Sequence, residues 1–187
     1  VGYVAYDAWS TGHRVEIEQL NPAFTDSLGA AASSGALTPS NNEAPILFQR
    51  GGWFYLLYGE CCCFCHQGSD TYALVASHPL GPWAVVGTGG DLNPRVNVAG
   101  DRRIRAQESF VIEVPTRSSL GRNETTILYV GDLWASAPPP EHFKSEDGQY
   151  WQPLAFNDSV SPPTIAALRF VPSFELNMRT VAARLPR

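Results

Sequence analysis

The sequence predicts an all-β fold, and three features of the chain lead to that class. Its apolar and aromatic residues come in short runs, each followed by a turn signal, which is the pattern of strands rather than helices. The 187 residues include 16 Gly and 15 Pro, which suits a protein dense in turns. Only the stretch 22–32 is compatible with a helix, which would be short. A chain of this length fits one domain, so residues 1–187 are expected to form a single unit.

The first half of the chain contains five candidate strands. The segment "HRVEIEQL" (13–20) alternates Val15 and Ile17 with charged residues, as a strand with one solvated face should. The segment "WFYLLYG" (53–59) does not alternate, which predicts a strand covered on both faces. The other three are "GYVAY" (2–6), "APILFQR" (44–50) and "TYALVAS" (71–77).

The second half contains four more candidate strands. They are "SFVIEV" (109–114), "TILYVGDLW" (126–134), "YWQPLAF" (150–156) and "TIAALRFV" (164–171). Half-buried and fully buried strands joined by short turns predict sheets stacked around a centre, as in a propeller, or face to face, as in a sandwich. Periodicity alone does not choose between these two architectures.

The charge and hydropathy of the chain exclude two classes of partner. The net charge is -5, and a protein that binds nucleic acid needs clustered Lys and Arg. The one basic cluster, "DRRIR" at 101–105, is interpreted as a loop or the rim of a binding site. No run of 18 apolar residues is present, so no membrane-spanning helix is expected. The chain begins at Val1 without Met or a signal-like leader, which suggests a processed or incomplete chain.

A cluster of sulfur follows the fourth predicted strand, at Cys61, Cys62, Cys63 and Cys65. Neighbouring strand residues point to opposite sides, so three consecutive cysteines do not readily face one tetrahedral zinc ion, even with His66 beside them. No metal site is therefore expected. Disulfides fit better, and they indicate a secreted protein. Four cysteines allow three pairings, and the sequence does not choose among them.

Two N-glycosylation sequons support the same extracellular location. They begin at Asn123 ("NET") and Asn157 ("NDS"), in turn-rich segments where surface acceptors belong.

Several motifs, taken in order, resemble glycoside hydrolase family 43. The stretch "EAPILFQRGGWFYLLYGE" (43–60) followed by "YALVASHPLGPW" (72–83) is similar to one blade of the five-bladed β-propeller of that family. The stretches "AQESFVIEV", "ILYVGDLWASAP" and "QYWQPLAF" resemble the next blade in its galactanase-like and related fungal branches. The resemblance extends from Val1 to Leu176 and implies a partial propeller, with about half to three-fifths of the ring.

The resemblance implies that Glu43, the glutamate of E-A-P, is the general acid. A glycosidic oxygen is a poor leaving group, so a protonated carboxyl group must supply a proton as the bond breaks. Pro45 is expected to bias Ala44 toward an extended conformation and so to present Glu43 at the mouth of an inner strand. The alternative is that Glu43 caps a turn in water.

The family pattern also places a general base and a second, pKa-tuning aspartate ahead of the acid. The segment "VGYVAY" aligns with the end of the hairpin that follows these residues, so both are expected upstream of residue 1. The ring would then be open, with strand edges and an apolar face left for a partner to cover.

Two further polar residues are candidates for the pocket. Gln107 occupies a position that, by the resemblance, orients water or a sugar hydroxyl opposite the acid; it could equally be an amide satisfied by the backbone. Glu108 should point to the other face of the strand, so that only one of the two lines the pocket. Glu60, at the end of its hairpin strand, is either a second pocket carboxylate or a solvated strand end.

Aromatic residues add candidate subsite walls, because indoles stack on the C–H faces of sugars. Trp134 and Trp9 are the candidates, whereas the other tryptophans are expected to pack between blades. Asp132, in "GDLW", either binds a sugar hydroxyl or ties a turn. His13 aligns near the propeller axis, where some family members hold calcium through water, so the resemblance allows calcium there although the residues themselves indicate no cofactor.

The sequence thus predicts a secreted glycosidase that performs inverting hydrolysis on a plant-type polysaccharide, either β-1,3-galactan or side chains with arabinose or xylose. An oligo- or polysaccharide is the expected partner, with neither nucleic acid nor membrane. The alternative is a non-catalytic carbohydrate-binding or degenerate propeller fragment, or an unrelated β-sandwich lectin.

Overall fold

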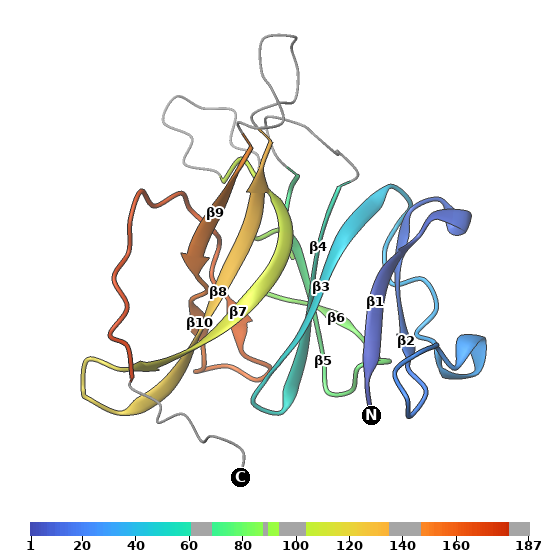
Figure 1. Ribbon diagram of the computed structural model, residues 1–187, viewed down its shortest axis with the longest axis horizontal. Coiled ribbons are helices and arrows are strands. Elements are labelled where there is room, and N and C mark those ends of the chain that lie inside the picture. Colours follow the sequence, from blue (N-terminus) through green and yellow to red (C-terminus); the bar gives the residue numbers. More distant parts are fainter. Residues whose placement is uncertain (61–68, 88–89, 94–103, 135–146, 180–187) are drawn as a thin grey trace, which may run out of the picture.

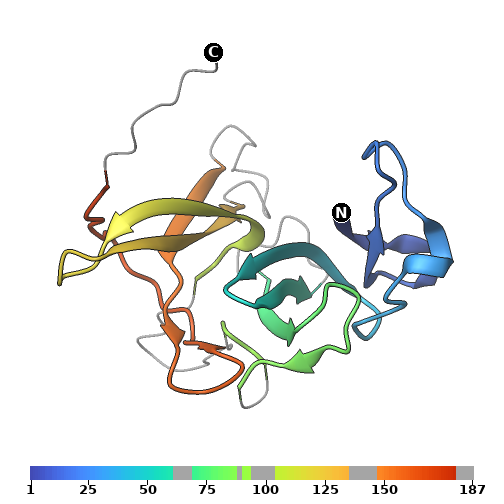
Figure 2. The ribbon, with the colours of Figure 1, turned by 90° about the horizontal axis from the view of Figure 1, so that it is seen from below.

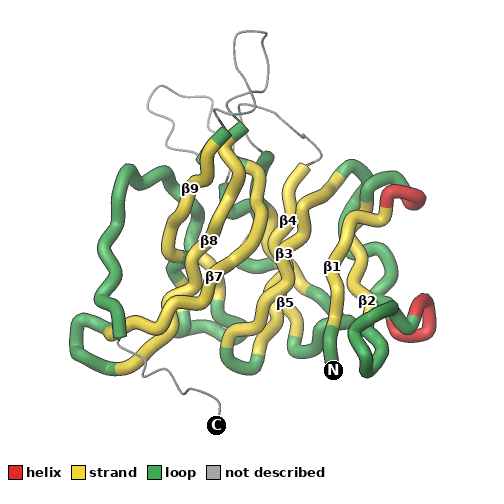
Figure 3. Tube along the Cα trace, in the orientation of Figure 1, coloured by secondary structure: helices red, strands yellow, loops and turns green. Residues whose placement is uncertain are grey.

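In the computed structural model, the described part of the chain is built from strands (Figures 1 and 3). The structure describes residues 1–60, 69–87, 90–93, 104–134 and 147–179. The elements are β1 (Tyr3–Ala8), η1 (Trp9–Thr11), β2 (Arg14–Gln19), η2 (Gly29–Ala32), β3 (Asn42–Arg50), β4 (Trp53–Glu60), β5 (Tyr72–Ala76), β6 (Ala84–Val85), β7 (Gln107–Arg117), β8 (Asn123–Leu133), β9 (Gly148–Pro153), β10 (Phe156–Asn157) and β11 (Thr164–Ile165).

The strands form antiparallel sheets whose members follow one another along the chain. Their orders are β1-β2, β3-β4-β5-β6, β7-β8-β9 and a short pair β10-β11. The predicted all-β class is therefore confirmed. Two elements are shorter than expected: within 22–32 only a 3-10 turn at Gly29–Ala32 is helical, and within 164–171 only Thr164–Ile165 is a strand.

The three larger sheets stand side by side in an open arc (Figure 2). The first strand of the middle sheet, β3, lies between its neighbours and contacts both β1 and β7 (Figure 1). The start of each later sheet therefore meets the preceding one, which brings the first residues of β3 and β7 together.

Both faces of the middle sheet are buried, as the lack of alternation in β4 predicted. Leu57 packs toward the third sheet in a cluster that includes Tyr129, and Leu56 packs toward the first sheet with Val15 and Ile17. Leu56 and Leu57 are both 0% exposed, so each inter-sheet core has a fully buried leucine from the same strand. Burial of this kind is the main source of stability between sheets that are not joined by a strand-to-strand hydrogen-bond ladder.

The inner strands of the second and third sheets each carry a β-bulge near their first residue. In β3 the register shifts between Glu43 and Ile46, and in β7 it shifts between Glu108 and Phe110. A bulge places two residues opposite one and re-aims the side chains before it. Residues two apart on a regular strand share a face, yet Phe110 is 41% exposed and Glu108 only 2%.

A bidentate ion pair ties the middle sheet to the C-terminal segment. The guanidinium of Arg50 donates to both carboxylate oxygens of Asp158, at 2.5 and 2.9 Å, and lies 4.2 Å from the ring centroid of Phe156. No helix in the part of the chain that the structure describes is long and apolar enough to span a membrane.

Candidate active site

The site is centred on Glu43, the second residue of β3. Its side chain turns toward the third sheet and is 8% exposed. The side-chain Nε2 of Gln107, the first residue of β7, donates a hydrogen bond to Glu43 Oε1 at 3.0 Å. The two residues are 64 positions apart in the sequence, so packing of the sheets, and not local structure, brings them together.

Trp134 extends this contact into a series of three side chains. Its indole Nε1 donates to Gln107 Oε1 at 3.0 Å. The amide of Gln107 therefore has its oxygen held by Trp134 and its nitrogen aimed at Glu43, which fixes its orientation. Sequence reasoning named all three residues separately; the structure brings them into one hydrogen-bonded row.

The backbone after Glu43 differs from the prediction. Ala44 has φ of +54°, in the left-handed region, instead of the extended conformation expected before a proline. The bulge explains the difference, because the chain must absorb an extra residue between Glu43 and Ile46. The left-handed backbone at Ala44 is therefore part of what directs Glu43 into the interface.

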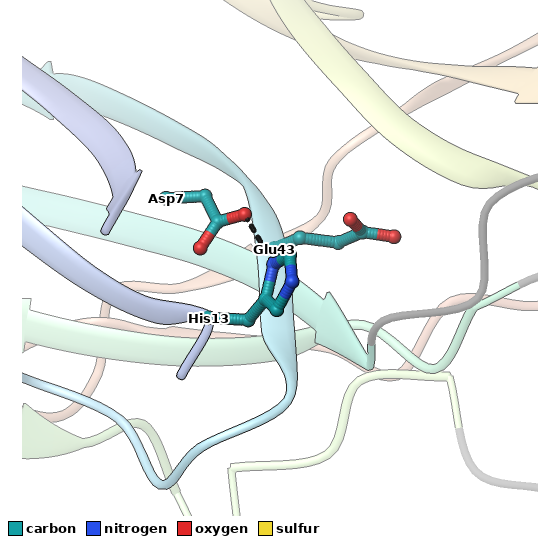
Figure 4. Close-up of side chains that lie close together, drawn as sticks. All are labelled: Asp7, His13 and Glu43. Atoms are coloured by element: carbon teal, nitrogen blue, oxygen red, sulfur yellow. Dashed lines mark hydrogen bonds and ion pairs between the residues drawn. The ribbon is translucent and has the colours of Figure 1, made fainter. Parts of the chain in front are cut away.

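A second pair of polar side chains lies beside Glu43. His13 Nδ1 and Asp7 Oδ2 are 2.7 Å apart, and Figure 4 shows Asp7 and His13 facing each other with the carboxylate of Glu43 turned aside from that pair. Each of the three residues offers a polar atom within 4.8 Å of the others. His13 was predicted near the pocket, whereas Asp7 was missed. An aspartate at the end of the strand that precedes His13 was the only signal for it.

Two carboxylates and one imidazole can bind a hydrated divalent cation, but Ca²⁺ takes six to eight oxygen ligands and these side chains supply few of them. Calcium at this position stays a prediction.

Trp9 lies on the solvent side of the same cluster. Its side chain is in η1, 77% exposed, and its ring centroid is 5.1 Å from that of His13. An exposed indole beside polar groups is the arrangement that a sugar ring can stack on. Of the tryptophans expected in the cores, Trp53 and Trp83 do pack there, whereas Trp151 is 42% exposed.

Asp132 and Glu60 do not join the row at Glu43. Asp132 accepts hydrogen bonds from Ser109 and Gln149, at 3.1 and 3.5 Å, and so ties the three strands of the third sheet. Glu60 lies on the opposite face of the middle sheet from Glu43, where it lines a cavity of about 410 Å³ with the stacked pair Tyr58 and Tyr72. Burial and nearby carboxylates raise the pKa of Tyr72 to about 12.

Glu108 is buried more deeply than Glu43 and Gln107, although it was expected to point to the other face of its strand. Gln107 and Glu108 both turn toward the middle sheet, the former to β3 and the latter to Gly59 on β4. The bulge in β7 accounts for this departure from simple alternation.

Some of the predicted residues lie outside the described part of the chain. They are the cysteines at 61, 62, 63 and 65, the histidine at 66, and the arginines at 102 and 103.

Comparisons with known proteins give matches only among solved structures. No protein-family model matches the sequence, and no curated protein matches it. The chain is similar to an exo-β-1,3-galactanase from Clostridium thermocellum, with a TM-score of 0.64, 22% identity, and coverage of 88% of this chain and 31% of that one. It is similar to a galactotriose-bound exo-β-1,3-galactanase from Phanerochaete chrysosporium, with a TM-score of 0.59, 18% identity, and coverage of 88% and 32%.

A thermostable family 43 glycoside hydrolase gives a TM-score of 0.54 at 19% identity, with coverage of 90% of this chain and 51% of that one. These likenesses show the fold: it is the β-propeller fold of the family 43 glycosidases, and here it forms a partial propeller. The chain spans about a third of the length of the two galactanases.

Proposed function

We propose that this chain supplies the general acid of a glycoside hydrolase that acts on a plant-type polysaccharide by inverting hydrolysis. The observation that carries the proposal is the row Trp134, Gln107, Glu43 at the meeting point of two sheets. A carboxyl group held there, out of bulk water and oriented by a fixed amide, has the setting that a proton donor to a glycosidic oxygen requires.

The proposed substrate is β-1,3-galactan, or else side chains with arabinose or xylose. The likeness to two exo-β-1,3-galactanases supports the first choice. Gln107 would orient a sugar hydroxyl or water, and Trp134 with the exposed Trp9 would form apolar walls of the subsite.

Inverting hydrolysis also requires a base that is separated from the acid by roughly 6.5–9.5 Å, so that a water molecule fits between them. Asp7 offers an oxygen within 4.8 Å of one on Glu43, which is below that range. We therefore assign Asp7 to holding His13 in place, and not to activating water.

The test is the substitution Glu43→Gln, which keeps the shape but removes the proton. Turnover of galacto-oligosaccharides and aryl glycosides should fall by about 10²-fold or more, while binding of the same oligosaccharides persists in calorimetry. Glu113→Gln, on the solvated side of β7, is the matched control and should leave turnover unchanged. Unchanged turnover in Glu43→Gln would rule out the assignment.

The second candidate is a carbohydrate-binding role without catalysis. The exposed indole of Trp9 next to His13 favours it, because stacking on a sugar needs no acid. Oligosaccharide binding without turnover in the unmodified chain would select this alternative.

We also propose an extracellular location. Its support is that Asn123 and Asn157, which begin the two sequons, are both exposed. We propose in addition that the four cysteines form disulfides, as is usual outside the cell. Alkylation of the unreduced chain, followed by a mass measurement, tests this: labelled cysteines would be free thiols and would contradict the proposal.

A further inference from the structure

A fully buried carboxyl group, that of Glu108, lies near the proposed acid Glu43, and the proposed function gives it no role. Glu108 is 2% exposed, and its Oε1 has no hydrogen-bond partner. Besides a hydrogen bond from its own backbone, its other oxygen receives a long contact from the hydroxyl of Thr71, at 3.4 Å. An ionised carboxylate there would have no cation among the described residues to offset its desolvation.

The fit around Glu108 is tight. A Cβ placed on Gly59 of β4 would lie 2.3 Å from Glu108 Oε1, 2.6 Å from the carbonyl oxygen of Asp70 and 2.8 Å from the side chain of Ser69. Only glycine therefore allows β4 and β7 to approach with this carboxyl group between them. The hydroxyl of Ser69, on the same side of Gly59, is also buried without a hydrogen-bond partner.

The charges that act on Glu108 from the described residues are all negative. Glu43 faces it from β3 and Asp70 from the segment before β5, while the phenol of Tyr129 faces it from β8. Burial first, and then these two carboxylates, raise the pKa of Glu108 well above its ordinary value, against the opposing hydrogen bonds from its own backbone and from Thr71.

We propose that Glu108 is a positioning residue of the site, which must carry its proton for the second and third sheets to stay in contact where Gln107 reaches Glu43. Glu108 and Gln107 are adjacent on β7, so a charge that forces Glu108 away from Gly59 also withdraws Gln107 from Glu43. The contact of Glu108 with Gly59 therefore makes the position of Gln107 beside Glu43 depend on pH. This inference adds to the proposed function, but the contacts it uses are present whether or not the chain is catalytic.

The expected pH dependence follows from the direction of the shift. Because the pKa of Glu108 is higher in the folded than in the unfolded chain, its contribution to stability is complete below the unfolded value and is lost as pH rises through the folded value. In the full chain, Glu108→Gln stays neutral and escapes this loss. Its free energy of unfolding relative to the unmodified chain should therefore increase as pH rises above about 4, the ordinary range of a glutamate pKa.

The control is Glu113→Gln, on the exposed side of the same strand, whose difference from the unmodified chain should stay flat over the same rise in pH. Two other readouts are specific to positioning. The NMR signals of the Gln107 side-chain amide should change with pH more in the unmodified chain than in Glu108→Gln, because both chains keep the hydrogen bond to Glu43 and only the first keeps the Glu108 carboxyl group. If the chain turns over substrate, the alkaline loss of kcat/KM should move to higher pH in Glu108→Gln.

A flat stability difference for Glu108→Gln, or a pH-independent Gln107 amide, would overturn the proposal. If that variant does not fold, a ¹³C NMR titration of the Glu108 carboxyl in the unmodified chain decides, and an ordinary pKa there would refute it. Failure of the proposed function leaves these measurements intact, since absence of turnover changes neither the stability nor the NMR titrations.

Discussion

At the scale of single residues, the site depends on backbone conformations that side chains seldom adopt. His13, a member of the polar cluster, and Ala44, which follows Glu43, have φ of +57° and +54°. Such values cost of order 1 kcal/mol or more for a non-glycine residue and persist where surrounding contacts impose them. At Ala44 this conformation was not predictable, because the rule for a residue before proline indicates an extended backbone.

The first prediction concerns this backbone. Ala44→Val should destabilise the chain by about 1–3 kcal/mol, since a β-branched residue at positive φ clashes with its own backbone. Ala84→Val is the control: Ala84 is exposed in strand β6, where valine is well tolerated. Urea unfolding of both variants gives the comparison, and equal stabilities would contradict a strained conformation at Ala44.

Residue-level inference also found the three members of the row but not their connection. Glu43, Gln107 and Trp134 were each named from motifs, whereas Asp7 and Glu108 were missed or misplaced. Alternation predicts which face a strand residue takes only while the register is regular. The bulge in β7 breaks that regularity between Glu108 and Phe110.

At the scale of elements, most strands were predictable because each is a short apolar run between turns. All nine predicted runs contain a strand, and β2 buries Val15 and Ile17 as its alternation indicated. The ends were less predictable. The run 164–171 is mostly apolar, yet only Thr164 and Ile165 pair with another strand, which is β10. A segment becomes a strand only where the edge of another strand is free to pair with it, and the sequence of the segment alone does not tell where that is.

The hairpin of β7 and β8 carries the sequon at Asn123, and its glycosylation can be tested. Asn123 begins β8 opposite Arg117, and both are exposed at the turn end of the hairpin. If the chain passes through a eukaryotic secretory pathway, Asn123 should receive a glycan, because an acceptor must be accessible. Endoglycosidase treatment should lower the mass of the secreted chain, and the drop should shrink in Asn123→Gln. A mass that matches the bare sequence would contradict the extracellular proposal.

At the scale of the whole molecule, both inter-sheet cores stabilise the chain, but only the core between the second and third sheets also holds the candidate site in place. Leu56 and Leu57 are neighbours on β4, are equally buried, and face the first and third sheets respectively. Sequence periodicity predicted that β4 is covered on both faces but could not decide between a propeller and a sandwich, because both architectures bury strands in that way. The family resemblance supplied that decision, and the fold confirms it.

This arrangement predicts different effects for two similar substitutions. Leu56→Ala and Leu57→Ala should each destabilise the chain by about 2–5 kcal/mol. Only Leu57→Ala loosens the interface that Glu43 and Gln107 share, so the side-chain amide protons of Gln107 should exchange with solvent faster in that variant. Equal exchange in the two variants would show that this interface does not hold the row together.

The 64-residue separation of Glu43 and Gln107 has a consequence for folding kinetics. The hairpins β3–β4 and β7–β8 close short loops and can form early, in microseconds, whereas the contact between these two side chains must wait until two finished sheets dock. Glu43 thus acquires Gln107 as its partner at the last stage of folding, and a chain stopped before that stage would have nearly all of its strands but not the hydrogen-bonded row.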